Sequence, residues 1–174
     1  MRKKRLLQLT AALLCAVILS ACGGAPADAD YTCTVSISCA TILDNMDQCA
    51  ESKKELVPAD GVILPPTEVA FAEGESAFDV LQRVCRDNGI HLESKLTPVY
   101  NSAYIQGIHN IYEFDVGKLS GWMYAVNDWF PNYGCSLYQV QDGDVIRWVY
   151  TCDLGADVGG GQAAGDGQQE GAST

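Results

Sequence analysis

The chain has 174 residues, of which 22 are acidic and 11 basic, so its formal net charge is −11. Four of the basic residues form one run at positions 2–5, and the chain's first acidic residue comes only after position 27. Removal of an N-terminal segment containing that run would leave seven basic and 22 acidic residues, a net charge of −15. This excess repels nucleic acid and anionic lipid, so we expect neither as a partner.

The N-terminus has the pattern of an export signal. After the basic run, the apolar residues 11–19 form a stretch too short to span a bilayer comfortably. The following residues, Leu19-Ser20-Ala21-Cys22, resemble a bacterial lipobox, in which cleavage leaves the cysteine as a lipid-bearing N-terminus. We therefore expect a signal peptide at 1–21 and a lipid on Cys22 that holds the protein on the extracytoplasmic face of the cell membrane. An ordinary secretory signal cleaved nearby is the alternative.

Composition divides the rest of the chain into three parts. Residues 22–30 form a short flexible tether, and residues 155–174 are rich in Gly, Ala, Gln and acidic residues, a composition typical of disorder. Residues 31–154 remain as one folded domain, which is long enough to bury a single core.

Eight cysteines are many for a bacterial chain. One leaves with the signal and Cys22 takes the lipid, so six remain: Cys33, Cys39, Cys49, Cys85, Cys135 and Cys152. An even number in an exported domain favours three disulfides. A zinc site is one alternative, although no C-x-x-C pair occurs. Six reduced thiols in anaerobic surroundings are the other.

The first half of the domain predicts two strands and a helix. Residues 31–38 alternate between apolar and polar side chains, which indicates a strand. Residues 40–66 are irregular, with a helical turn at 42–46, and Pro65-Pro66 end them before a short strand at 69–71. A helix follows, with Ser76 as its N-cap, Asp79 as its capping-box partner and Gly89 as its terminating glycine.

The second half predicts strands at 90–96, 104–108, 111–114, 122–126 and 145–150. Asn127-Asp128 forms a hairpin turn, because these residue types best tolerate positive φ. Asp142-Gly143-Asp144 forms a second turn. We interpret it as a plain turn and not a calcium loop, since an EF-hand needs more carboxylates at alternate positions.

This order of elements favours an α+β fold. One helix covers only one face of a sheet, so a roll with a mixed sheet and one main helix packed on one face is expected. A β-grasp-like arrangement fits, with the first and last strands parallel in the middle. Cys39 and Cys152 would then emerge at the same end of the sheet, within the roughly 4.4–6.8 Å between Cα atoms that a disulfide requires.

A resemblance to a known family spans essentially the whole folded region, about 31–154. It rests on the capped helix 76–81 and on the spacing of Gly121-Trp122-Met123-Tyr124-x-Val126-Asn127, Pro131-x-x-Gly134 and Tyr138-x-x-x-Asp142-Gly143-Asp144-x-Ile146-x-Trp148-x-Tyr150. These motifs resemble the transcobalamin-like C-terminal domain family, which is similar to the small β-domain of the cobalamin carriers transcobalamin and intrinsic factor. The resemblance implies a β-grasp-type fold and a corrinoid, such as cobalamin, as a possible ligand.

Two features depart from that family. Its members commonly have Asn-Gly at the hairpin turn, and the Asp128 found here predicts a strained or wider turn. The carriers also hold the corrin ring between this domain and an α/α-barrel, of which the sequence shows no sign.

Aromatic residues supply the candidate binding site. Trp122, Tyr124 and Trp148 alternate on strands, a pattern typical of core packing, whereas 129–133 lie at or after a turn that the core reaches poorly. Exposed aromatic side chains on a loop suggest a contact surface. The predicted ligand-binding residues are Trp122, Tyr124, Trp129, Phe130, Tyr133 and Tyr138.

No catalytic motif is present, so we do not expect an enzyme. His91 and His109 are the only histidines and form no H-E-x-x-H motif, and neither a G-x-S-x-G nor a phosphate-binding glycine loop occurs. Neither a resident cofactor nor a metal is expected. Two functions remain open. The domain captures a corrinoid at the membrane surface for a transporter, or it is an adhesion module that binds a surface protein or glycan.

Overall fold

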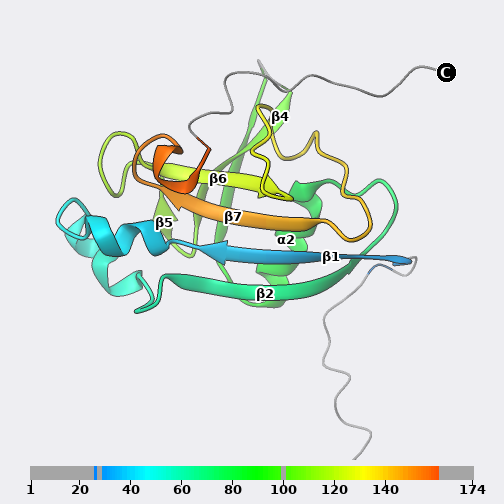
Figure 1. Cartoon of the computed structure of the whole chain (residues 1–174), viewed down its shortest axis with the longest axis horizontal. Coiled ribbons are helices and arrows are strands. Elements are labelled where there is room, and N and C mark those ends of the chain that lie inside the picture. The colour runs from blue at the N-terminus through cyan, green and yellow to red at the C-terminus, as the bar shows by residue number, and fades with distance from the viewer. Residues whose placement is uncertain (1–25, 27–28, 99–100, 161–174) are drawn as a thin grey trace, which may run out of the picture.

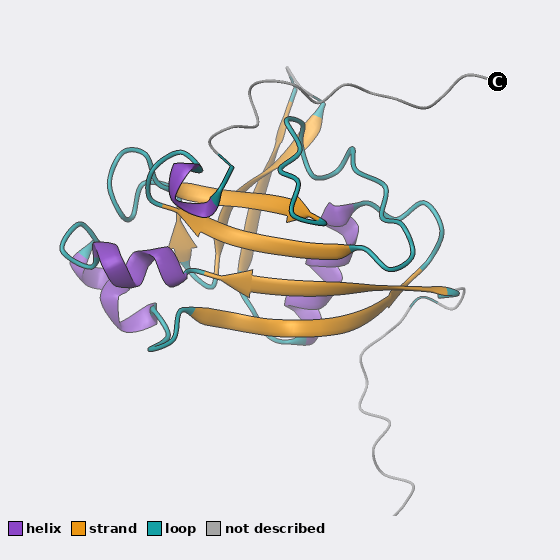
Figure 2. Ribbon diagram, in the orientation of Figure 1, coloured by secondary structure: helices purple, strands orange, loops and turns teal. Residues whose placement is uncertain are grey.

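The computed structural model describes residues 26, 29–98 and 101–160. The predicted signal peptide, Cys22 and residues 161–174 lie outside them, as does most of the predicted tether. The described chain forms two β-sheets, one α-helix and three short 3₁₀-helices (Figures 1 and 2). The predicted α+β class is therefore confirmed.

The larger sheet has four strands in the order β2-β1-β7-β6. The central strands β1 (Tyr31–Ser38) and β7 (Val145–Thr151) run parallel. The outer strands β2 (Val62–Phe71) and β6 (Gly121–Val126) pair with them antiparallel. The first and last strands of the domain thus lie side by side in the centre, as the β-grasp arrangement predicts.

Strand β2 differs from the prediction because it is ten residues long and contains both prolines. Pro65 and Pro66 lie at a register shift, since Val35 pairs with Thr67 while Ile37 pairs with Leu64. Proline lacks an N–H and is tolerated in edge strands and at bulges. Strand β2 lies at the edge of the sheet and has a bulge at the prolines, so both conditions hold. The prolines therefore lie within the strand, whereas they were expected to end the irregular segment before it.

Helix α2 (Ala77–Asp87) crosses one face of this sheet (Figure 1). Its predicted capping box is present: Ser76 Oγ accepts a hydrogen bond from Asp79 N at 3.2 Å, and Ser76 N donates to Asp79 Oδ2 at 2.9 Å. Gly89 follows the helix with φ of +65°, as predicted. The face of the helix toward the sheet is buried through Ala77, Val80, Leu81, Val84 and Cys85.

The second sheet contains the strands β3 (Leu92–Thr97), β4 (Ser102–Ile108) and β5 (Ile111–Tyr112), in that order. The strands were predicted with shifted ends, but their separation into a sheet of their own was not. The three 3₁₀-helices are η1 (Ala40–Asn45), η2 (Glu51–Leu56) and η3 (Ala156–Val158). The last of them, and the buried Gly160 after it, show that ordered structure continues beyond the predicted boundary at 154.

The six cysteines of the domain are free thiols, which differs from the three predicted disulfides. In the parallel ladder Ser38 pairs with Val149, so Cys39 follows next to Tyr150 and lies two residues short of Cys152. Two residues of strand span about 6–7 Å along the sheet. Together with the roughly 4.8 Å between neighbouring strands, this offset places the two Cα atoms farther apart than a disulfide allows. Thr41 is the neighbour of Cys152 instead: the thiol donates to Thr41 Oγ1 at 3.8 Å.

Candidate functional site

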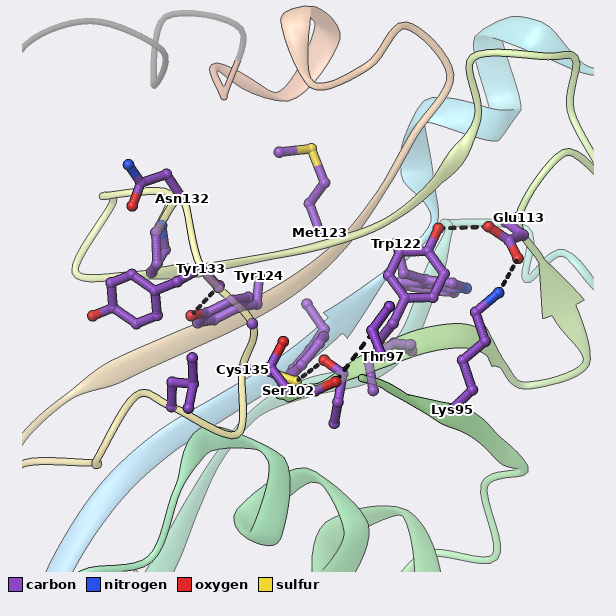
Figure 3. A pocket seen from close by; sticks show the side chains of 17 residues that line it. Lys95, Thr97, Ser102, Glu113, Trp122, Met123, Tyr124, Asn132, Tyr133 and Cys135 are labelled. Atoms are coloured by element: carbon purple, nitrogen blue, oxygen red, sulfur yellow. Dashed lines mark hydrogen bonds and ion pairs between the residues drawn. The ribbon is translucent and has the colours of Figure 1, made fainter. Parts of the chain in front are cut away.

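A cavity of about 630 Å³ lies between the two sheets. Strand β6 forms one wall, β3 and β4 form the opposite wall, and the loop after the hairpin turn closes one side (Figure 3). The lining is mostly apolar or aromatic and comprises Lys95, Thr97, residues 102–105, Glu113, residues 122–124, residues 131–135, Leu137 and Trp148.

Two aromatic pairs fix the β6 wall. Trp122 stands opposite Tyr150 in the ladder, with ring centroids 5.3 Å apart and edge to face, and Tyr124 stacks on Trp148 at 5.4 Å. The polar atoms of Trp122 and Tyr124, two of the rings that line the cavity, are also held. Trp122 Nε1 donates to Ile111 O at 2.8 Å, and Tyr124 OH donates to Tyr133 O at 3.0 Å. These buried rings therefore form a rigid surface whose orientation is set before any ligand arrives.

The hairpin turn is tight, contrary to the expectation of a wider one. Asn127 and Asp128 have φ of +50° and +66°, and Val126 and Trp129 exchange two backbone hydrogen bonds across them, at 2.8 and 2.9 Å. These are the positive φ values that a two-residue hairpin turn needs at both central positions, and Asn and Asp adopt them more readily than most residues.

The residues after the turn divide into exposed and buried ones. Trp129 is 46% exposed and Tyr133 39% exposed, with their rings 6.0 Å apart. Phe130 is only 5% exposed, which corrects its predicted position on the surface. Its ring lies so close to Gly160 that a Cβ there would be 3.1 Å from it. The segment after η3, assigned to a disordered tail by composition, covers this side chain.

Three of the six predicted ligand-binding residues line the cavity: Trp122, Tyr124 and Tyr133. The other three, Trp129, Phe130 and Tyr138, do not. Tyr138 instead donates its hydroxyl hydrogen bond to Asp144 Oδ2 at 2.8 Å.

The opposite wall carries a polar group that the sequence analysis missed. Tyr104 OH donates to Glu113 Oε2 at 2.5 Å, and Lys95 Nζ lies 3.9 Å from Glu113 Oε1 and 5.1 Å from the centre of the Tyr104 ring (Figure 3). Burial, followed by this contact with Glu113, raises the pKa of Tyr104 to about 12. Lys95 and Tyr104 are cross-strand partners in β3 and β4. Only that register brings them together, and no local sequence signal reveals it.

The Asp142-Gly143-Asp144 turn is a structural junction. Asp142 Oδ1 accepts from Thr32 N at 2.9 Å, and the buried Asp144 carboxylate accepts from Asn127 Nδ2, Tyr138 OH and Gln141 N, each at 2.8 Å. The chain's own donors thus engage these oxygens, which fits the predicted plain turn. No group of three or more His, Cys, Asp or Glu side chains within the described ranges is arranged to hold a metal ion.

The histidines take no part in the cavity. His91 is exposed and packs 5.9 Å from the Tyr112 ring, and neither it nor His109 is among the lining residues.

Among the described residues, no helix combines the length and apolar character that crossing a membrane requires.

Residues 74–152, from the loop before α2 to the end of β7, match the family described as "Domain of unknown function (DUF4430)". No curated protein matches the chain. Among solved structures, haptocorrin in complex with Cbi is similar with a TM-score of 0.53 and 13% identity, over 71% of this chain and 25% of the haptocorrin chain. A candidate metal binding protein from Ruminococcus gnavus ATCC 29149 matches with a TM-score of 0.42 and 15% identity, over 70% of this chain and 97% of that one.

The similarity to haptocorrin places this chain among proteins that share one α+β domain fold. The chain corresponds to about a quarter of the haptocorrin chain. At 13% identity the likeness concerns the fold alone. It agrees with the resemblance to cobalamin-carrier β-domains that the motifs around β6 and β7 indicated.

Proposed function

We propose that the cavity beside β6 binds a flat, amphipathic small molecule, and that this ligand is a corrinoid such as cobalamin or cobinamide. The observation that carries the proposal is the cavity itself: about 630 Å³, walled by fixed aromatic rings on one side and bearing one polar group on the other. Its size falls within the usual 300–1,000 Å³ of small-molecule sites, and a mostly apolar lining with few polar groups is typical of them.

The aromatic wall suits a planar ligand. Trp122 and Tyr124 are held by hydrogen bonds and by their partners on β7, so binding costs them little conformational entropy. Tyr133 is partly exposed at the rim and is free to pack on a bound molecule. Haptocorrin, which shares the fold, was solved in complex with Cbi, and this supports the choice of a corrinoid.

The affinity of this domain alone should be modest. Well-formed sites bury about 70–90% of their ligand, and a single domain covers one face of a corrin ring. We expect a Kd in the micromolar range or weaker, roughly −8 kcal/mol at best. A transporter or surface protein that covers the other face would tighten binding, which fits a lipoprotein that captures a ligand outside the membrane and passes it on.

A second function, adhesion to a protein or glycan, is supported by one specific observation. Trp129 is about half exposed, lies outside the cavity and packs against Tyr133. Exposed aromatic side chains of this kind are common in protein interfaces. Under this alternative Trp129 would carry the binding energy and the cavity would stay empty.

The decisive experiment is a calorimetric titration of the Cys22→Ser chain with dicyanocobinamide and cyanocobalamin. Tyr133→Ala should weaken binding about five- to tenfold, whereas Tyr31→Ala should leave it unchanged. Tyr31 is a matched control because it is similarly exposed but lies on β1 against Phe71, away from the cavity. No heat of binding for either corrinoid would reject the proposal. Equal losses of corrinoid affinity in the Tyr133 and Tyr31 variants would place the binding site elsewhere.

Anchoring needs its own test. We propose that lipid on Cys22 holds the domain on the extracytoplasmic face of the membrane. Cys22→Ser should then release the protein into the medium or leave its precursor uncleaved, and fatty-acid labelling should be lost. Unchanged labelling in that variant would contradict the proposal.

A further inference from the structure

Within the described part of the chain, the outer edge of β6 presents backbone groups without a backbone partner. In an antiparallel pair, the N–H and C=O groups of successive residues point alternately toward the partner strand and away from it. Val126 N–H and C=O bond to Trp129, on the side away from β7, while Asn127 N donates to Val145 O on the β7 side. Counting back in twos from Val126, the backbone groups of Tyr124 and Trp122 also point away from β7.

No described strand occupies that edge. Strand β6 is the last in the order β2-β1-β7-β6, and its hydrogen-bonded neighbour is β7. Among the backbone hydrogen bonds of residues 29–98 and 101–160, none outside the sheet ladders reaches Trp122 or Tyr124. Two N–H donors and two C=O acceptors are thus left without a backbone partner, in a fixed row.

The cavity runs along this edge. Residues 122, 123 and 124 all line it, although side chains alternate between the two faces of a strand. Figure 3 shows Met123 on the opposite side of the strand from Trp122 and Tyr124. Three consecutive residues line one cavity only where it borders the strand's edge, so the unpaired backbone groups face the ligand.

We propose that the ligand of this cavity carries neutral amide groups on its periphery, and that these pair with the backbone N–H and C=O of Trp122 and Tyr124. The inference rests on the proposed small-molecule site and names the ligand chemistry that this site selects. A purely apolar ligand would bury the four backbone groups unpaired, and each would lose its hydrogen bonds to water without a replacement. An amide both donates and accepts, so it matches a row in which N–H and C=O alternate.

The charges around the cavity favour a neutral ligand. Among the described residues that line it, Lys95 and Glu113 alone carry ionic side chains, and Lys95 Nζ lies 3.9 Å from Glu113 Oε1. The charge of the whole chain is −11. A carboxylate ligand would meet backbone C=O groups and Glu113 without donating a hydrogen bond to either, whereas an amide donates to both.

Hydrogen exchange followed by NMR tests the edge directly. In the free protein the amide hydrogens of Trp122 and Tyr124 should exchange faster than those of Met123 and Ala125, which bond to β7 and serve as controls on the same strand. Saturation with dicyanocobinamide should slow exchange at Trp122 and Tyr124 at least tenfold and leave Met123 and Ala125 unchanged. Binding without protection at Trp122 and Tyr124 would overturn the inference and leave the proposed function standing.

A pair of probes tests the ligand chemistry. Dicyanocobinamide carries peripheral amides, whereas the heptamethyl ester of dicyanocobyrinic acid carries esters, which accept but do not donate hydrogen bonds. The ester is the more apolar, so burial alone would favour it. Pairing with the β6 edge predicts that dicyanocobinamide binds at least tenfold more tightly. Equal or tighter binding of the ester overturns the inference alone, and failure of both probes to bind overturns it together with the proposed function.

Discussion

Asn127 and Asp144 join the hairpin turn after β6 to the turn before β7. Asn127 Nδ2 donates to Asp144 Oδ1 at 2.8 Å, and Asn127 Oδ1 accepts from Val145 N at 2.9 Å. Because Asp144 O also accepts from Thr34 N of β1 at 2.8 Å, one residue connects three strands of the sheet. The pair fixes the end of β6 from which the cavity loop departs.

Asp144→Ala should destabilise the protein by about 3 kcal/mol or more. The substitution leaves the side-chain donors of Asn127 and Tyr138 and the backbone N–H of Gln141 without their acceptor, and hydrogen bonds to a charged group contribute about 1.5–3 kcal/mol each. Asp142→Ala, in the same turn, removes one exposed bond to Thr32 N and should cost about 1 kcal/mol or less. Urea unfolding of both variants measures the difference. Similar midpoints would show that Asp144 does not organise the junction.

Phe130 and Trp129 are adjacent and should respond in opposite ways to truncation. Phe130→Ala should cost about 3–4 kcal/mol, because its buried ring packs against the segment ending at Gly160. Trp129→Ala should cost about 0.5–1 kcal/mol, as expected for a side chain that remains largely exposed. Thermal unfolding of the two variants, with circular dichroism of the folded state as a check, compares them. A larger loss in the Trp129 variant would contradict the assigned burial.

Local sequence signals predicted the central part of the fold. The alternation in β1, the capping box at Ser76 and the Asn127-Asp128 turn each depend on residues a few positions apart, and all three occur in the structure. Their order along the chain was enough to indicate a parallel pair of central strands under one helix.

The features that sequence failed to predict depend on distant contacts. The polar group opposite β6 requires the register that pairs Lys95 with Tyr104. The burial of Phe130 requires residues near 160 to fold back over the hairpin loop. The continuation of β2 through two prolines requires an edge position and a bulge opposite β1. Lys95 and Tyr104 are nine residues apart, but the residues between them do not determine the register of β3 and β4. The partners of the other two contacts are about 30 residues apart in the chain, beyond the reach of a local sequence pattern.

The buried thiols should resist modification while the protein is folded. Burial raises the pKa of Cys85 and of Cys135 to about 12, so at pH 8 both thiols stay protonated and unreactive. Cys152 is the most exposed of the six and should react first with a thiol reagent such as Ellman's reagent. Guanidinium should then release the remaining thiols together. Rapid reaction of Cys85 or Cys135 in the folded protein, located by peptide mapping, would contradict this prediction. Mapping without reductant would also reveal any disulfide formed in the exported protein.

The pKa of Tyr104 should depend on Glu113, its partner on the polar side of the cavity. Its pKa is raised from 10.0 to about 12, first by burial and then by the hydrogen bond and charge of Glu113. The folded state therefore favours the protonated phenol. This contribution to stability is complete below pH 10 and is lost as the pH rises from 10 toward 12. Glu113→Gln should lower the pKa of Tyr104 toward 10, with burial keeping it above that value.

The measurement is a spectrophotometric titration of tyrosinate, compared between each protein and its Tyr104→Phe counterpart so that the difference isolates one phenol. The native pair should give a step near pH 12 and the Glu113→Gln pair a step at lower pH. Identical steps would mean that Tyr104 does not donate to Glu113, and that the two side chains do not form the polar side of the cavity as one unit. Saturating dicyanocobinamide should move the native step to higher pH, because a ligand covering Tyr104 removes water from the phenol and disfavours its charged form.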